Sequence, residues 1–283
     1  IPAMVEDGYD KDFSAAVTAA SSIIGPTIPP SNMMVIYGSL MGVSIAGLFA
    51  AGFIPGLLLG GMLMILSGYI SKKRGYPKKE RRSTIKEMVV AFWDAILALL
   101  MPVIILGGIL SGVFTPTEAA SIAVAYAFLV GKFVFKSLKL KDIPELLEQT
   151  ARTTGVVFLI IASASILGWI LASERVPEQI AAMFLQISSN KYVILLMINL
   201  LMLIVGMFMD IAAALVILGP ILHPLAVSIG VPPIQFGIIM VLSLNVALMT
   251  PPVGACLFVV SGITKLSLEQ ISKAIWPFIV VEV

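Results

Sequence analysis

Two pairs of adjacent prolines interrupt long apolar stretches of this chain, and small or oxygen-bearing residues gather beside both. The pairs are Pro29-Pro30 and Pro251-Pro252. Adjacent prolines cannot continue a helix, because two amide protons are missing and the rings clash with the preceding turn. In lipid, the carbonyls that lose their partners must find others in protein, water or an ion. The residues concerned are Ser21, Ser22, Gly25, Thr27, Ser31, Asn32, Ser243, Asn245, Thr250 and Gly254.

Unwound carbonyls beside hydroxyl groups are suited to holding a hard cation such as sodium, which takes oxygen ligands. The alternative is a proline kink in which the hydroxyls bond back to their own helix. Two matching breaks favour ion or substrate binding over this alternative. The predicted sodium-binding residues are Ser21, Ser22, Gly25, Thr27, Gly206, Met209, Asp210, Ala247 and Thr250. The predicted substrate-binding residues at the breaks are Ser31, Asn32, Ser243 and Asn245.

Asp210 stands in the sequence GMFMDIAAAL, between two strongly apolar segments. An isolated carboxylate at membrane depth is costly, so it is a functional candidate by default. It could support a sodium ion, or cap a helix that begins at Ile211 by accepting free amides. The two roles can coexist, and the carbonyls of Gly206 and Met209 just before it could also face an ion.

Three further polar residues have both a structural and a functional interpretation. His223 precedes Pro224 in an apolar helix, where a hydrogen bond to a carbonyl is favoured over a role as proton carrier. Glu118 closes Thr115-Pro116-Thr117-Glu118, the order of a helix capping box with proline at the first helical position. Arg175 lies on the predicted outer face, either in a solvated loop or as a docking contact.

Composition places the chain in a membrane. Of its 283 residues, 59% are hydrophobic and 12% are charged, and soluble domains carry about twice that charged fraction. The formal net charge of +2 is too balanced for nucleic-acid binding. A single cysteine and a single histidine exclude a disulfide framework and a cysteine/histidine zinc site. Familiar hydrolase and nucleotide-binding motifs are absent, and the intramembrane acids and histidine have no spacing suited to an enzyme.

Apolar segments long enough to cross a bilayer recur along the chain, and their length and uniformity favour helices over barrel strands. They cover residues 13–38, 48–70, 95–113, 118–135, 153–172, 192–209, 211–229 and 234–262, with another starting at Ile275. Basic residues crowd the loop 71–87, which the positive-inside rule places in the cytoplasm. Stretches 83–94, 143–150 and 176–188 mix charged with apolar residues and predict interfacial helices or solvated loops.

The chain also repeats itself at an offset of 222 residues. The pairs brought together are Pro2 and Pro224, Val5 and Val227, Gly8 and Gly230, Ser21 and Ser243, Pro29-Pro30 and Pro251-Pro252, and Ser39 and Ser261. The charge-based topology makes the first copy run outward and the second inward, so the repeats are inverted, as in secondary transporters. We therefore expect an all-α polytopic membrane protein with inverted repeats and interrupted helices.

The predicted organisation has four parts. They are the first-repeat part of a transport domain (1–39), scaffold and arm helices with the basic loop (40–189), a second-repeat transport domain with the segment pair 192–229 and the broken helix 234–262 (190–264), and the start of a last helix (265–283). The segment pair 192–229 precedes the second copy, and no counterpart of this pair stands before Ile1 to precede the first copy. The last apolar segment, WPFIVVEV, is too short to span a membrane. Truncation is therefore expected at both ends.

Five stretches resemble the large membrane subunit of tripartite ATP-independent periplasmic (TRAP) transporters. They are AAVTAASSIIGPTIPPSNMMVIYG (15–38), AGFIPGLLL (51–59), ILGGILSGVFTPTEAASIAVAYAFLVG (105–131), NLLMLIVGMFMDIAAALVILGPILHPLA (199–226) and LMTPPVGACLFVV (248–260). Together they are specific, whereas TPTEAA or a double proline alone is a weak signal. The resemblance covers nearly the whole chain in order.

The resemblance implies a sodium-coupled elevator mechanism in a bacterial inner membrane, a small membrane partner subunit, and a periplasmic binding protein that delivers an organic acid. Sialic acid, a C4-dicarboxylate and a sugar acid remain open as substrates. The resemblance also implies that 192–229 is a re-entrant hairpin, that another hairpin with the other sodium site precedes Ile1, and that Glu118 lies on the substrate path. Arg175 would then dock the delivering protein. A passive channel and an intramembrane enzyme are the alternatives.

Overall fold

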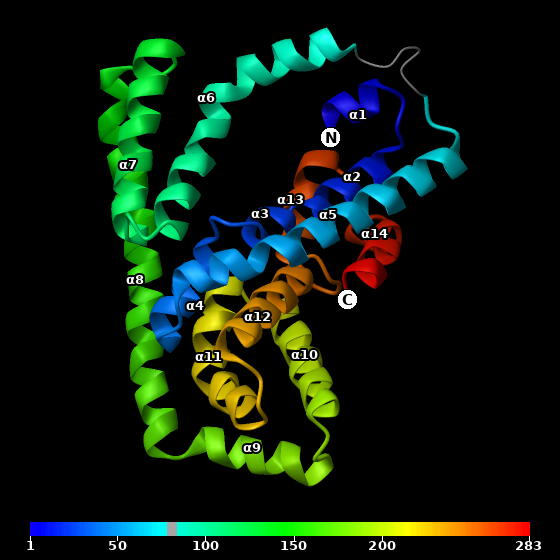
Figure 1. Ribbon diagram of the computed structural model, residues 1–283. Coiled ribbons are helices and arrows are strands. Elements are labelled where there is room, and N and C mark those ends of the chain that lie inside the picture. The colour runs from blue at the N-terminus through cyan, green and yellow to red at the C-terminus, as the bar shows by residue number, and fades with distance from the viewer. Residues whose placement is uncertain (78–83) are drawn as a thin grey trace. The chain divides into compact units, whose positions relative to one another are not determined.

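The computed structural model describes residues 1–77 and 84–283, and all regular structure in these ranges is helical (Figure 1). The chain divides into two compact units, one comprising Ile1–Pro77 with Ile161–Val283 and the other Lys78–Ile160. These divisions differ from the predicted boundaries at residues 39 and 189, so the four-part organisation stays a prediction. Four basic positions of the predicted loop 71–87 lie outside the described residues: Lys78, Lys79, Arg81 and Arg82.

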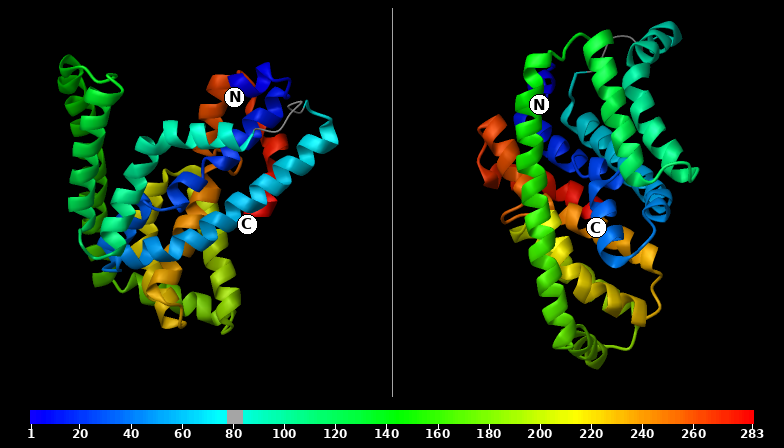
Figure 2. Two further views of the ribbon diagram at one scale, coloured as in Figure 1. Left: turned by 45° about the horizontal axis from the view of Figure 1, so that its top comes forward. Right: turned by 90° about the vertical axis from the view of Figure 1, so that its left-hand side faces the viewer.

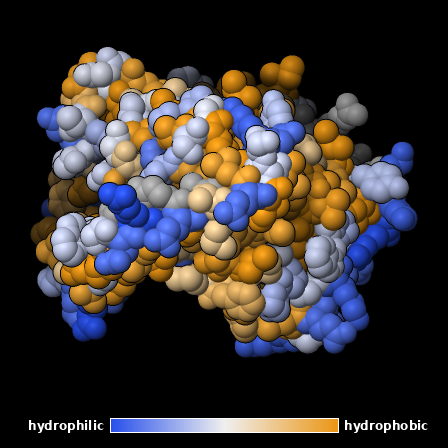
Figure 3. All heavy atoms as spheres, turned by 90° about the horizontal axis from the view of Figure 1, so that it is seen from below, coloured by the Kyte–Doolittle hydropathy of each residue, from blue (hydrophilic) through white to orange (hydrophobic). Residues whose placement is uncertain are grey.

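Six helices among the described residues are long and apolar enough to cross a membrane. They are α5 (Ile45–Arg74), α6 (Ile85–Leu110), α7 with the following π-helical turn (Pro116–Val134), α8 (Ile143–Ser173), α10 (Lys191–Phe208) and α11 (Ile211–Ser228). At about 1.5 Å per residue, even the shortest of them approaches the ~30 Å of bilayer hydrocarbon. Apolar side chains accordingly cover much of the face shown in Figure 3. The prediction of an all-α, multi-pass membrane protein is confirmed.

In the unit that follows residue 77, α6 and α7 lie side by side (Figures 1 and 2). Tyr126 of α7 donates a hydrogen bond to the carbonyl of Leu97 in α6 at 2.7 Å. Both helices begin with a capping box, and the one from Thr115 to Glu118 is the one that the sequence predicts. A short 3₁₀ turn, Leu140–Asp142, then leads into α8.

Two of the predicted interfacial helices are parts of longer helices. The sequence predicts 83–94 and 95–113 as separate elements, but Ile85–Leu110 is one helix. Likewise, 143–150 and 153–172 both fall within α8. The prediction was wrong because a change from charged to apolar composition does not end a helix where no proline or cap intervenes. The third stretch, 176–188, is a helix of its own, α9 (Val176–Ile187).

In the unit of 1–77 and 161–283, both proline pairs interrupt a helix. The first copy comprises α1 (Pro2–Glu6), α2 (Lys11–Ser21), α3 (Ile24–Thr27) and α4 (Asn32–Met41), and the second comprises α12 (Pro233–Leu248) and α13 (Ala255–Thr264), followed by α14 (Leu268–Glu282). Each proline pair contains a cis peptide bond. Gly8 and Gly230, which the sequence offset superimposes, have φ of 88° and 81°. The repeat in the sequence is therefore also a repeat of backbone structure.

The two broken helices pack against each other in opposite directions. α12 contacts α3 and α4, whereas α13 contacts α2. Each half of one copy thus lies beside the opposite half of the other copy, and the two breaks meet between them. The helix α5 contacts both copies, and α10 and α11 pack on α12 (Figure 1). This is the inverted, interrupted arrangement that the sequence predicts.

Close packing of α12 against α4 and α5 depends on Gly237. A Cβ atom there would lie 2.5 Å from Cε1 of Tyr37 and 2.7 Å from Cδ2 of Leu48. Both side chains are fully buried, and the Tyr37 hydroxyl lies 2.6 Å from Nδ1 of His223. Because the tyrosine ring is held in this way, it cannot move aside to admit a larger residue at position 237.

An exposed ion-pair cluster joins the end of α5 to the start of α2. The Arg74 guanidinium lies 3.2 Å from Asp10 and 3.1 Å from Asp12, and the Tyr76 hydroxyl donates to Asp10 at 2.7 Å. The hydrogen bond from Tyr76, with a smaller contribution from Arg74, holds the pKa of the Asp10 carboxyl below its ordinary value. Because these groups are largely solvated, the cluster orients the first repeat more than it stabilises it.

Replacing Gly237 by alanine is expected to destabilise the protein by about 1–3 kcal/mol, because the added methyl group overpacks a buried contact. Gly262 provides the matched control, since it is helical and a Cβ there meets nothing within 4 Å. G262A should keep or slightly raise stability, because alanine is the better helix former. Thermal unfolding of the full-length protein in detergent measures both variants, and equal melting temperatures would contradict the packing argument.

Candidate functional site

Each proline pair leaves two helix carbonyls without their usual partners. A helix carbonyl accepts from the amide four residues later, and at the breaks those positions are prolines, which have no N–H group. The Ser31 hydroxyl and the Thr250 amide satisfy one carbonyl in each break, which leaves those of Gly25 and Leu248 for another ligand. The four affected carbonyls are those of Gly25 and Pro26 in the first break and of Ala247 and Leu248 in the second.

A buried hydrogen bond joins the two breaks. Nδ2 of Asn245 donates to Oγ1 of Thr27 at 3.2 Å, across 218 residues of chain. The Thr27 hydroxyl in turn donates to the carbonyl of Ile23 at 2.7 Å. Both side chains are fully buried, and Oδ1 of Asn245 is buried without a hydrogen-bond partner. The breaks are therefore connected through side chains, with one buried acceptor still open.

Hydroxyl groups at the breaks bond back to their own helices. Thr250 donates to the carbonyl of Val246 at 2.7 Å. Ser22 donates to the carbonyl of Ala19 at 2.6 Å, and Ser21 makes a similar bond. A proline kink without a site would show the same pattern. However, a hydroxyl that donates its proton keeps its oxygen lone pairs, so these bonds orient the oxygens without excluding an ion.

The turn between α10 and α11 lies against the second break. The carbonyl of Met207 accepts from the amide of Gly254 at 3.2 Å. A Cβ atom on Gly206 would lie 2.6 Å from Cβ of Ala247. The two helices therefore meet beside the middle of the broken helix and not at its end. That the pair is a re-entrant hairpin stays a prediction. The predicted residues Gly206, Ala247 and Asp210 are brought to the same region.

Asp210 caps α11 at this turn. Its Oδ1 accepts from the amide of Ala212 at 2.9 Å, and its side chain is exposed. The predicted cap is confirmed, and Met209 precedes it in extended conformation. A cap of this kind uses one of the two carboxylate oxygens, so the other can serve as a ligand. The sodium role of Asp210 stays a prediction.

Gly254 shapes the second break. Its φ is 44°, in the left-handed region, and a Cβ atom there would lie 2.9 Å from the carbonyl oxygen of Thr250 and 3.1 Å from that of Leu248. Two carbonyl oxygens thus converge on a space that only glycine leaves open. Just beyond it, Sγ of Cys256 lies 3.4 Å from Oγ of Ser22. The start of α13 therefore meets the first break.

The whole chain, residues 1–283, matches a family model described as the DctM component of the tripartite ATP-independent periplasmic transporters. The chain belongs to the DctM family. The match confirms the resemblance that the five sequence stretches indicate. It covers both repeats, the hairpin and the intervening helices.

Relatives of this DctM-family chain are named as transporter permeases. It is 47% identical over 279 residues to the isethionate TRAP transporter permease protein DctMQ of Oleidesulfovibrio alaskensis, which covers 99% of the chain and 44% of that protein. It is 44% identical to the sialic acid TRAP transporter large permease protein SiaM of Vibrio cholerae, over 99% of the chain and 65% of that protein. It is 36% identical to the C4-dicarboxylate TRAP transporter large permease protein DctM of Rhodobacter capsulatus, over 99% of the chain and 66% of that protein. The chain thus spans about half to two thirds of the length of these relatives.

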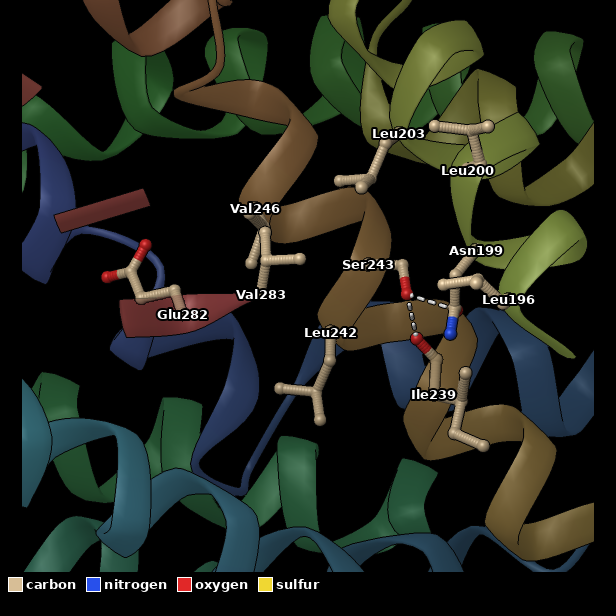
Figure 4. A pocket seen from close by; sticks show the side chains of 10 residues that line it. All are labelled: Leu196, Asn199, Leu200, Leu203, Ile239, Leu242, Ser243, Val246, Glu282 and Val283. Atoms are coloured by element: carbon tan, nitrogen blue, oxygen red, sulfur yellow. Dashed lines mark hydrogen bonds between the residues drawn. The ribbon is translucent and has the colours of Figure 1, made fainter. Parts of the chain in front are cut away.

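Among the predicted substrate-binding residues of this DctM-family chain, Ser243 lies away from the breaks. Its hydroxyl lies 2.9 Å from Oδ1 of Asn199 in α10 and 2.8 Å from the carbonyl of Ile239, beside a mainly apolar cavity of about 340 Å³ (Figure 4). Asn245 lies only two residues further on, but two residues turn a helix by about 200°, so it faces the other way. Ser243 therefore helps to hold the hairpin against α12, and its substrate role stays a prediction.

The remaining predicted residues lie at helix starts. Ser31 caps α4 by accepting from the amide of Met34, and Asn32 is exposed in its first turn. Glu118 belongs to the other compact unit, where its carboxylate accepts from the amide of Thr115 at 2.8 Å. Arg175 precedes α9 with φ of 52° and is exposed. The substrate and docking roles of these residues stay predictions.

Two polar contacts of the DctM-family chain are not anticipated from its sequence. His223 has the Tyr37 hydroxyl as its partner, not the carbonyl that the sequence favours, and Tyr37 itself donates to the carbonyl of Pro233 at 3.3 Å. The expectation was wrong because Tyr37 comes from α4, in the other repeat. Asn199 is the second case. Its position inside an apolar run does indicate a buried polar contact, since polar groups at membrane depth need partners. The sequence could therefore have identified Asn199 as a residue with a hydrogen-bond partner, although not which partner.

Removing the cap of α11 is expected to cost stability in proportion to the lost amide bond. Asp210→Ala should destabilise the protein by about 0.5–2 kcal/mol, whereas Asp210→Asn should be nearly neutral, because asparagine caps helices as well as aspartate does. Thermal unfolding of the full-length protein in detergent separates the two. Equal stability of the alanine variant and the wild type would show that the Asp210–Ala212 bond does not hold the turn.

Proposed function

We propose that the full-length protein is a sodium-coupled secondary transporter that imports an organic acid across a bacterial inner membrane. The observation that carries the proposal is the meeting of two oppositely directed broken helices, joined by the buried hydrogen bond between Asn245 and Thr27. Secondary transporters use interrupted helices of inverted repeats to offer carbonyls and helix ends to ions and substrates. Relatives named for isethionate, sialic acid and C4-dicarboxylates support an organic acid as the cargo.

Sodium is the proposed coupling ion because the available ligands are mostly neutral oxygens. Among residues 1–77 and 84–283, no group of three or more histidine, cysteine, aspartate and glutamate side chains is placed to hold a metal. Carbonyl and hydroxyl oxygens suit hard cations, not transition metals. The proposed ligand regions are Ser21, Ser22, Gly25 and Thr27 at the first break, and Gly206, Met209, Asp210, Ala247 and Thr250 at the second.

Helix ends at the breaks are the proposed partners of the acid. Both α4 and α13 begin there, and the first turn of a helix presents free amides and a partial positive charge. No side chain caps the start of α13. The segments 21–32 and 243–256 contain no lysine or arginine. The substrate charge is then balanced by helix dipoles and by sodium, with Ser31 and Asn32 supplying hydrogen bonds. The substrate role of Asn245 stays a prediction, since its amide nitrogen donates to Thr27.

Alternating access by an elevator movement would carry the two repeats across the membrane. The packing of both breaks and the hairpin tip into one compact unit supports their moving together. A periplasmic binding protein would deliver the acid, and a small membrane subunit would complete the transporter. Arg175, exposed before α9, is the proposed contact for the binding protein, and Glu118 is proposed to lie on the substrate path.

Uptake into proteoliposomes distinguishes this function from the alternatives. A passive channel would admit the acid without a sodium gradient, and an intramembrane enzyme would convert it chemically. We expect uptake of labelled isethionate, sialic acid or a C4-dicarboxylate only with a sodium gradient and the cognate binding protein. Sodium-independent uptake by the reconstituted transporter would refute the proposal.

Thr250 tests the second sodium site. Thr250→Ala removes a proposed oxygen ligand and should raise the sodium concentration for half-maximal uptake about tenfold, equivalent to ~1.4 kcal/mol. Thr250→Ser keeps the hydroxyl and should stay close to the wild type. The measurement is initial uptake rate against sodium concentration at saturating acid. An unchanged sodium dependence in the alanine variant would remove Thr250 from the site.

Asp210→Asn tests the carboxylate separately from the cap, because asparagine preserves the cap. The variant should unfold at the wild-type temperature but need more sodium for half-maximal uptake, since a neutral amide attracts a cation less than a carboxylate does. Uptake and thermal unfolding are measured on the same preparation. Wild-type sodium dependence in this variant would leave Asp210 with the capping role alone.

A further inference from the structure

The direction of the hydrogen bond between the breaks follows from its end point. The carbonyl of Ile23 can only accept, so the single proton of the Thr27 hydroxyl is committed to it. Thr27 must therefore accept from its other neighbour, which is Nδ2 of Asn245 at 3.2 Å. This chain of bonds sets the orientation of the amide and turns Oδ1 away from Thr27. The buried, unpartnered atom is thus the amide oxygen, and the amide group has one protein partner.

An amide held by a single bond makes the contact sensitive to a displacement of either break. With Thr27 in place, Nδ2 is satisfied, although Oδ1 is not. If Thr27 moves, the fully buried amide loses its only partner, and burying a polar group without one is costly. A displacement of the first break is therefore opposed unless the second break moves with it.

Contacts continue from Asn245 to the proposed ion ligands on both sides. Thr27 lies two residues after Gly25, whose carbonyl is one of the two that keep no local donor. On the other side Asn245 precedes Ala247, which packs against Gly206 of the hairpin tip, and Leu248, which carries the second such carbonyl. The buried amide is thus a side-chain link between the two groups of oxygens.

We propose that Asn245 is a positioning residue that couples cation binding at the two breaks. The inference rests on the proposed sodium-coupled function and goes beyond it by assigning the source of cooperativity. Filling the first site holds Thr27, which holds the Asn245 amide, which in turn fixes the end of α12 where the second site lies. Coupling of this kind is reciprocal, so filling the second site strengthens the first.

The test is sodium titration of uptake by the complete reconstituted transporter carrying Asn245→Ala. The wild type should show a Hill coefficient above one. The variant should show one close to unity, together with a rise of about fivefold or more in the sodium concentration for half-maximal uptake, the low end of measured site couplings. Neither set of proposed sodium ligands loses an atom in this variant, so a fall in the Hill coefficient reports the loss of coupling and not the loss of a ligand.

Tyr37→Phe is the matched control, since it removes a side-chain hydrogen bond of similar kind between α4 and α11 that does not link the breaks. It should leave the Hill coefficient unchanged. A second variant covers the case in which Asn245→Ala fails to fold. Asn245→Leu keeps a similar side-chain volume and leaves no buried amide without a partner, but it donates no hydrogen bond to Thr27, so it should also lower the Hill coefficient.

The outcomes separate the inference from the proposed function. If wild-type uptake does not depend on sodium, the proposed function fails. If the wild type is cooperative and Asn245→Ala keeps its Hill coefficient, the coupling inference is overturned while the function stands. A variant that raises only the substrate KM, with sodium cooperativity intact, would likewise overturn it and make Asn245 a substrate contact.

Discussion

The arrangement of the unit formed by residues 1–77 and 161–283 depends on one constraint. Proline removes the hydrogen-bond partners of several backbone carbonyls, and the surrounding lipid offers no water to replace them. Each such group costs about 1–3 kcal/mol when it is buried unsatisfied, and each break creates two of them. A local donor satisfies one carbonyl in each break: the Ser31 hydroxyl donates to the carbonyl of Pro26, and the Thr250 amide donates to that of Ala247. The other two carbonyls, those of Gly25 and Leu248, have no local donor. The hydrogen bond between Asn245 and Thr27 brings the two breaks together, so these open carbonyls belong to adjoining segments.

Glycine and alanine make that meeting possible. The hairpin tip can approach the second break only because Gly206 has no side chain that would clash with Ala247. Gly254 likewise leaves room for two carbonyl oxygens that a Cβ atom would displace. Gly237 lets α12 approach the buried Tyr37 ring closely. In membrane proteins such close approach replaces the hydrophobic driving force that helices lack in lipid. The small residues thus serve the same end as the prolines, which is to bring backbone oxygens and amides together.

Much of this architecture follows from the sequence, because its signals are local. Proline pairs mark the breaks, and the interrupted helices α2 to α4 and α12 to α13 confirm them. Apolar runs predict helices long enough to span a membrane, and such helices are found. Asp210 before Ile211 predicts the start of α11, which its cap confirms. Predictions failed where packing decides. The partner of His223 is Tyr37, 186 residues away, and no spacing rule reveals it. Ser243 and Asn245 look equivalent in the sequence, yet α12 turns one toward Asn199 and the other toward Thr27. The roles of the site residues in ion or acid binding depend on such orientations, and so lie beyond what residue types alone can indicate.

The chemical nature of the link between the breaks also matters. A charged pair at this depth would attract ions strongly, but it would carry a desolvation penalty that its mutual attraction does not reliably offset. It would also add a fixed charge to a part proposed to cross the membrane, where each elementary charge interacts with the membrane potential. An amide and a hydroxyl carry no net charge, so this link adds no charge of its own to the part that would move. At the same time, the directionality of the Asn245–Thr27 bond makes it sensitive to displacement of either break. A neutral, buried and singly bonded amide therefore meets both demands, which an ion pair or an apolar contact would not.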